Sequence, residues 1–150
     1  MRWWTTLVLA VLAACDPAAA DVATTQPDEV MDIRGTYSLT LTEIEGCEAT
    51  GDELSWVGDT LVIGGTPTAL EFDFGDGATL EGTVDTAFAV DADGQVAVDG
   101  AIHDVVYVGV ALLGDDGWEL DADLAADVRE STDADIGCTL QARLGANQDP

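Results

Sequence analysis

Apolar and polar residues alternate with a period of two along most of the chain from residue 34 onward. Alternation of this kind is typical of antiparallel strands that bury one face and expose the other. Clusters of Gly and Asp separate the alternating segments, as in hairpin turns. The pattern predicts eight strands, with a ninth left open by an ambiguous stretch at residues 99–104. The predicted strands lie near residues 36–44, 59–64, 68–74, 78–91, 95–102, 105–113, 117–128 and 137–144.

Two of these segments carry more detail. Residues 118–128 show the cleanest alternation, with acidic residues at most of the outward positions. In the long segment 79–91 one apolar face is predicted to hold Leu80, Val84, Phe88 and Val90, and hairpin turns are predicted at residues 75–77, 91–94 and 115–117. No segment has a helical period longer than two turns, and a short helix is expected only around Leu54 and Trp56.

The first residues have the layout of a secretory signal: one arginine, an apolar stretch and small residues before Cys15. The apolar stretch is too short to span a bilayer as a helix. The sequence Leu12-Ala13-Ala14-Cys15 resembles the lipobox of bacterial lipoproteins. This resemblance implies that residues 1–14 are a signal peptide cut before Cys15, that the Cys15 thiol carries a diacylglycerol, and that the new amino group is acylated. The alternative is an ordinary signal peptide that happens to precede a cysteine.

The rest of the chain divides into a tether and one domain. Residues 15–31 hold the lipidated cysteine and a proline-containing, acidic stretch without a sustained apolar period, which predicts a flexible tether. The domain is expected at residues 32–146 and a short tail at residues 147–150.

The three cysteines are an odd number for an exported protein. If Cys15 carries lipid, Cys47 and Cys138 remain as a pair, and a disulfide between them suits the oxidising side of a membrane. Two free buried thiols are the alternative. Pairing the first and last strands antiparallel so that Cys47 faces Cys138 also places Leu41 opposite Leu144, both on the predicted core face. Ile44 interrupts this parity and predicts a bulge.

Pairing the first strand with the last closes the sheet and removes both exposed edges. The predicted fold is therefore an all-β antiparallel barrel of eight or nine strands whose first and last strands are linked by a disulfide, with a β-sandwich as the alternative. The opening Gly35-Thr36-Tyr37 is similar to the Gly-x-Trp of the lipocalins, with Tyr in place of Trp. That resemblance implies an eight-stranded barrel and assigns no ligand.

The amino-acid composition limits the classes of partner that the protein can bind. The chain has 30 acidic and 4 basic residues, all arginine, and a formal charge of −26. This charge excludes a nucleic-acid binder and argues against docking of the protein surface on an anionic membrane. The membrane is therefore expected to be a partner only through the N-terminal lipid. A small apolar ligand inside the barrel and a protein on its surface both stay open as further partners.

No catalytic residue is predicted. His103 is the single histidine and Asp104 follows it, but no serine lies in a nucleophile-elbow context, and zinc lacks a ligand set. No cofactor is expected. Asp91 and Asp93 are Ca²⁺ candidates, because Ca²⁺ prefers carboxylate and carbonyl oxygens. They are weak candidates, because their spacing departs from that of an EF-hand.

The segment 105–113 is apolar on both faces, unlike its neighbours. A loop or second sheet would explain this by covering the outer face; otherwise Val105, Tyr107 and Gly109 are the candidate partner surface.

These observations predict a lipid-anchored protein of the bacterial envelope whose barrel is a non-enzymatic binding or structural module. The alternatives are a Ca²⁺-dependent adhesion or matrix protein and a secreted hydrolase. The protein is expected to face the periplasm or the exterior, with the choice of inner or outer membrane open.

Overall fold

The structure is a computed structural model that describes residues 31–47 and 54–150. It contains eight antiparallel strands and confirms the all-β prediction. The strands are β1 (Gly35–Gly46), β2 (Thr60–Thr66), β3 (Ala69–Asp73), β4 (Thr79–Val84), β5 (Ala89–Val98), β6 (Ala101–Leu113), β7 (Trp118–Arg129) and β8 (Cys138–Gln148).

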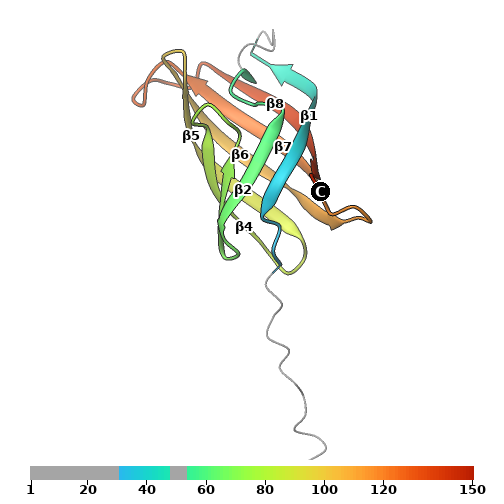
Figure 1. The fold of residues 1–150 in the computed structure, drawn as a ribbon. Helices are drawn as coiled ribbons and strands as arrows, with labels where there is room; N and C mark the ends of the chain where they lie inside the picture. The colour runs from blue at the N-terminus through green and yellow to red at the C-terminus, as the bar shows by residue number, and fades with distance from the viewer. Residues whose placement is uncertain (1–30, 48–53) are drawn as a thin grey trace, which may run out of the picture.

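The strands form a closed barrel in which each strand pairs with its neighbours in sequence and β1 pairs with β8 (Figure 1). This closure confirms the barrel and excludes the sandwich. Closure gives every strand a partner on each side along at least part of its length.

The seam between β1 and β8 follows the predicted register. Leu41 pairs with Leu144, and the register then shifts between Thr42 and Glu45, where the interruption at Ile44 predicted a bulge. Beyond the bulge a disulfide joins Cys47 to Cys138, with 5.2 Å between their Cα atoms. The bridge closes a sequence separation of 91 residues, and it confirms the predicted link between the first and last strands.

The predicted strand at residues 78–91 is wrong, because the chain turns in its middle. β4 ends at Val84 and β5 begins at Ala89. The carboxylate of Asp85 accepts hydrogen bonds from the backbone N–H groups of Ala87 (2.8 Å) and Ala89 (2.9 Å), which fixes the turn. Phe88, predicted to face the core, lies in this turn with a φ of 68° and is 43% exposed.

The predicted turn at residues 91–94 is also wrong, because these residues lie inside β5: all four pair with β6, and residues 91–93 pair with β4 as well. The ambiguous stretch at residues 99–104 contains the turn between β5 and β6, made by Asp99 and Gly100, which both have positive φ. Eight strands result because one predicted strand is split and its second half is joined to the next.

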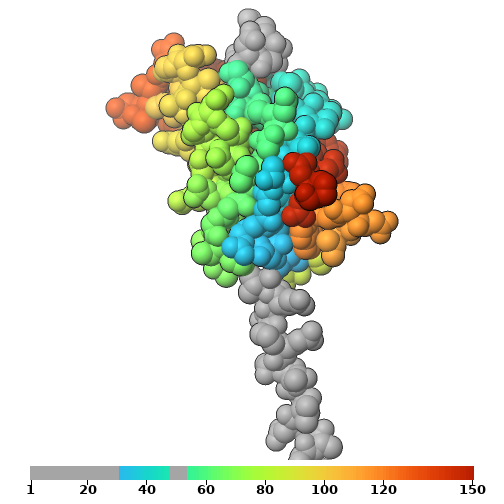
Figure 2. All heavy atoms as spheres, viewed as in Figure 1, coloured from blue at the N-terminus to red at the C-terminus, as the bar shows by residue number. Residues whose placement is uncertain are grey.

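The last strand of the barrel extends further toward the C-terminus than predicted. β8 runs to Gln148, so Asn147 and Gln148 are strand residues rather than tail. Asp149 then donates its backbone N–H to the carbonyl of Thr36 and accepts a hydrogen bond from the Ser38 hydroxyl. In Figure 2 the last residues, in dark red, lie against the blue start of β1.

The interior is one hydrophobic core with contributions from every strand. Its largest fully buried side chains are Tyr37, Tyr107, Phe72, Phe74, Ile33, Leu61, Ile63, Leu70, Leu80, Leu124, Leu140 and Leu144. The short helix expected around Leu54 and Trp56 is a single turn in the described residues, closed by a hydrogen bond from Val57 N–H to the Leu54 carbonyl (2.9 Å). Both side chains are buried, so this turn closes part of one end of the barrel. Among the described residues no helix is long and apolar enough to cross a membrane.

Candidate functional site

The barrel interior is filled by a chain of aromatic rings. Tyr107 lies between Phe72 and Phe74, at centroid distances of 5.6 and 5.9 Å. Phe74 also packs edge-on against Trp56 at 5.7 Å, and Trp56 packs edge-on against the imidazole of His103 at 6.4 Å. Burial raises the pKa of the Tyr107 hydroxyl above its ordinary value. The interior along this line therefore holds side chains rather than space for an apolar ligand.

His103 and Asp104 lie on opposite faces of β6. The His103 side chain is inside the barrel and is 3% exposed. Asp104 points outward, accepts a hydrogen bond from Gln95 Nε2 at 2.6 Å, and forms an ion pair with Arg129. Since neighbouring residues of a strand alternate between its faces, this histidine and this carboxylate do not form an acid–base pair.

The predicted partner surface on β6 is wrong, because its residues lie on the inner face of the strand and not on the outer face. Val105 and Tyr107 are fully buried, and Gly109 lies on the same inner face. The outer face consists instead of a row that we call the β6 stripe: Val106, Val108, Val110 and Leu112, which are 45%, 48%, 43% and 53% exposed. No described loop or second sheet covers this row, so the apolar outer face is open to solvent in this part of the chain.

The residues of the β6 stripe were missed because a segment that is apolar on both faces gives no period from which to choose the buried one. The hairpin to β7 supplies the missing signal. Trp118 faces inward at the start of the clean alternation, and Leu113 pairs with it across the turn. Counting along both strands from this pair places Tyr107 opposite Leu124, inside the barrel.

Acidic residues flank the β6 stripe on both sides. On β5, Asp93 pairs with Val106 and Asp91 pairs with Val108. On β7, Asp123 pairs with Val108, and the stripe's remaining acidic neighbours there are Asp121, opposite Val110, and Glu119, opposite Leu112. The stripe is therefore an apolar row between two rows that contain carboxylates.

The calcium candidates Asp91 and Asp93 belong to one of these rows. Both lie on the outer face of β5 and line a shallow depression of about 490 Å³ over β3, β4 and β5. There Asp93 pairs with Glu81, which in turn pairs with Glu71, so carboxylates stand side by side across three strands. No group of three or more metal-ligating side chains is gathered tightly enough to hold an ion anywhere in the described residues.

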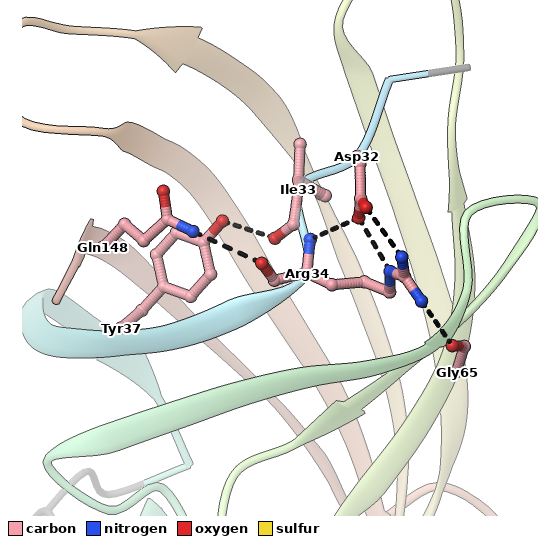
Figure 3. Close-up of polar contacts among 6 residues, drawn as sticks. All are labelled: Asp32, Ile33, Arg34, Tyr37, Gly65 and Gln148. Atoms are coloured by element: carbon pink, nitrogen blue, oxygen red, sulfur yellow. Dashed lines mark hydrogen bonds and ion pairs between the residues drawn. The ribbon is translucent and has the colours of Figure 1, made fainter. Parts of the chain in front are cut away.

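The start of the domain is fastened to the barrel by the contacts in Figure 3. The Arg34 guanidinium donates to both carboxylate oxygens of Asp32, each at 2.7 Å, and to the Gly65 carbonyl at 3.3 Å. These hydrogen bonds lower the pKa of Asp32 to about 2. Tyr37 donates its hydroxyl hydrogen to the Ile33 carbonyl, and Gln148 donates its amide to the Arg34 carbonyl. The point at which the preceding chain joins the barrel is thus fixed.

The proposed lipidation site, Cys15, lies outside the described residues. The other two cysteines form the disulfide, which confirms the predicted pairing and excludes two free thiols.

Comparison of the chain with protein families, with curated proteins and with solved structures gives no match. The chain is therefore defined by its own features: a closed, filled, eight-stranded barrel with one disulfide, an acidic outer wall and one apolar outer stripe.

Proposed function

We propose that this protein is a lipoprotein of the bacterial envelope, held to a membrane by acyl chains on Cys15. The observation that carries the proposal is the partition of the cysteines. Cys47 and Cys138 are joined to each other, which leaves Cys15 as the one cysteine outside the bridge, directly after Leu12-Ala13-Ala14. A disulfide that spans the barrel seam also suits an oxidising compartment outside the cytoplasm.

The barrel would serve as a non-enzymatic binding or structural module, and its outer wall is a better candidate for binding than its interior. The preference for the outer wall is supported by the aromatic side chains in the interior, which contact one another in a row that begins at Phe72 and ends at His103. A non-enzymatic role is supported by His103 and Asp104, which point to opposite faces of β6. Turnover of a generic ester, peptide or glycan substrate by the purified protein would contradict it.

The lipid anchor can be tested by metabolic labelling with a fatty-acid analogue in an exporting bacterial host. We expect label on the full-length gene product, none on Cys15→Ser, and an unchanged label per chain on the double variant Cys47→Ser/Cys138→Ser. Cys15→Ser should keep the disulfide, as read by alkylation of free thiols and mass spectrometry. Label that persists in Cys15→Ser, or a wild-type N-terminus without acyl mass, would overturn the proposal.

A further inference from the structure

The β6 stripe is an apolar surface that the barrel does not need for its own packing. Its four residues stand at alternate positions of one strand, each between 43% and 53% exposed. The neighbouring strand β7 has Glu119, Asp121, Asp123 and Ala125 at the paired outward positions and forms the same core without an apolar outer row. Contiguous exposed apolar rows rimmed by polar residues mark interaction surfaces.

Most of the carboxylates beside the stripe have no arginine of the described residues to pair with. Each arginine in the described residues already pairs with an aspartate: Arg34 with Asp32, Arg129 with Asp104 and Arg143 with Asp121. The sequence contains no lysine. Arg143 also stands opposite Asp123 on β8. Asp91, Asp93 and Glu119 therefore flank the stripe with negative charge that only a group from outside the described domain can complement.

The shape of the surface restricts the form of a partner. From Val106 to Val110 the stripe is paired with β5 on one side and β7 on the other, so a partner cannot add a strand there and must lie on the outer face. The stripe covers six residue steps, about 20 Å of strand, which equals about 13 residues of α-helix. The rows of β5 and β7 lie about 10 Å apart, close to the width of a helix with its side chains.

We propose that the β6 stripe docks a cationic amphipathic helix of a protein partner. The apolar face of the helix would cover Val106, Val108, Val110 and Leu112, while Lys or Arg on its flanks would reach the carboxylates of β5 and β7. The inference rests on the proposed role of the barrel as a binding module and adds the surface and the chemistry of the partner. A second copy of this chain fits less well, because it would bring two acidic flanks together.

The probe for this surface is an 18-residue peptide with Leu at helical positions i, i+3, i+4 and i+7 and Lys on both sides of the Leu row. The control peptide has the same composition with Leu and Lys dispersed around the helix. Binding to the full-length gene product in neutral detergent is measured by fluorescence anisotropy at physiological salt. We expect the striped peptide to bind at least about tenfold more tightly than the dispersed one, a difference of about 1.4 kcal/mol.

Two matched pairs of variants locate the binding. Val108→Thr should weaken it about fivefold, whereas Val62→Thr, at an exposed valine of β2 with a similar exposure of 44%, should leave it unchanged. Asp91→Asn/Asp93→Asn should weaken it more than Asp76→Asn/Asp115→Asn, which removes the same charge at exposed turns. Thr suits an exposed strand position, so the variants should keep the fold, as circular dichroism would verify.

Equal binding of the two peptides, or equal losses in the members of either pair, would overturn the proposal. It would also be overturned by a wild-type dimer that Val108→Thr dissociates, or by attachment to phosphatidylcholine vesicles of a Cys15→Ser chain that Val108→Thr abolishes. Lipid labelling at Cys15 does not depend on any of these results, so failure of the helix proposal and failure of the anchor are distinguishable.

Discussion

β6 and β7 are neighbours that pair along almost their whole length, yet the outer face of one is apolar and that of the other is mostly acidic. Their inner faces are alike: Val105 pairs with Ala126 and Tyr107 with Leu124, all buried. On the outer side, β7 carries mostly carboxylates and β6 carries the apolar stripe. The barrel constrains the inner alternation of each strand but leaves the outer residues free. An apolar outer face on one of two such neighbours therefore calls for an explanation outside the fold.

The largest expected effect comes from the inner face of β6. Tyr107→Ala should lower the free energy of unfolding by about 3–5 kcal/mol, because it removes a fully buried ring packed between Phe72 and Phe74. Val108→Ala, one position along on the outer face, should cost less than about 1 kcal/mol. Urea unfolding followed by tryptophan fluorescence measures both. Similar losses in the two variants would mean that the two faces of β6 are not divided as described.

Tyr107→Phe is the control for the ring itself. The Tyr107 hydroxyl is buried without a hydrogen-bond partner among the described residues. Removing it leaves no other group unpaired, so Tyr107→Phe should be neutral or slightly stabilising. A loss above about 1 kcal/mol in this variant would show that the hydroxyl makes a contact that matters for stability.

A smaller effect is expected at Gly109, where β6 has no room for a Cβ beside β7. A Cβ added at Gly109 would lie 2.4 Å from the Cβ of Ala122 and 2.4 Å from the carbonyl oxygen of Asp121. Gly109→Ala should therefore destabilise the barrel by about 1–3 kcal/mol through overpacking. Ala122→Gly in the same chain should recover part of the loss, since it removes the contact with the Ala122 Cβ.

Gly64→Ala is the matched control, because a Cβ there meets no atom within 4 Å. It should be close to neutral in the same urea experiment. An equal cost at Gly64 and Gly109 would point to backbone preference rather than to packing between β6 and β7.

The contrast between β6 and β7 also explains what the sequence could predict. Where only one face is apolar, as in β7 and β8, alternation alone identified the buried residues, and the parity change at Ile44 located the bulge. In β6 both faces are apolar, so alternation could not choose between Tyr107 and Val108. That choice depends on pairing with Leu124, which only the hairpin register reveals.

The second failure lies in the choice between turn signals. Asp91, Asp93 and Gly94 have the composition of a turn, whereas Asp85 to Phe88 contains no glycine. The turn nevertheless forms at Asp85, because its carboxylate satisfies two backbone N–H groups. Pairing on both sides then holds Asp91 and Asp93 in an extended strand. Local composition therefore predicted the turn at residues 91–94 instead of at Asp85, because it contains no information about the pairing of these residues with other strands.

The smallest expected effect concerns the carboxylates on the outer face of β7. Arg143 holds Asp121 through two hydrogen bonds, Nε to Oδ1 at 2.9 Å and Nη2 to Oδ2 at 2.6 Å, and these lower the pKa of Asp121 below its ordinary value. A lowered pKa stabilises the folded state above the ordinary aspartate pKa, and the stabilisation is lost as the pH falls through and below that value. Arg143→Gln should therefore raise the pKa of Asp121 and weaken the protein slightly at pH 7. The difference between wild type and variant should vanish in strong acid.

NMR titration of the Asp121 carboxyl and urea midpoints at pH 7 and pH 2 check both parts. The loss should be smaller than that of Gly109→Ala, because both side chains are about half exposed and solvent screens the pair. In an Asp121→Asn background Arg143→Gln should have no further effect, and an undiminished loss there would contradict the pairing. If the pair behaves as expected, the negative charge of Asp121 is compensated by Arg143 of the same chain. Asp91, Asp93 and Glu119, which have no such arginine in the described domain, then become the carboxylates beside the β6 stripe that a cationic partner would meet first.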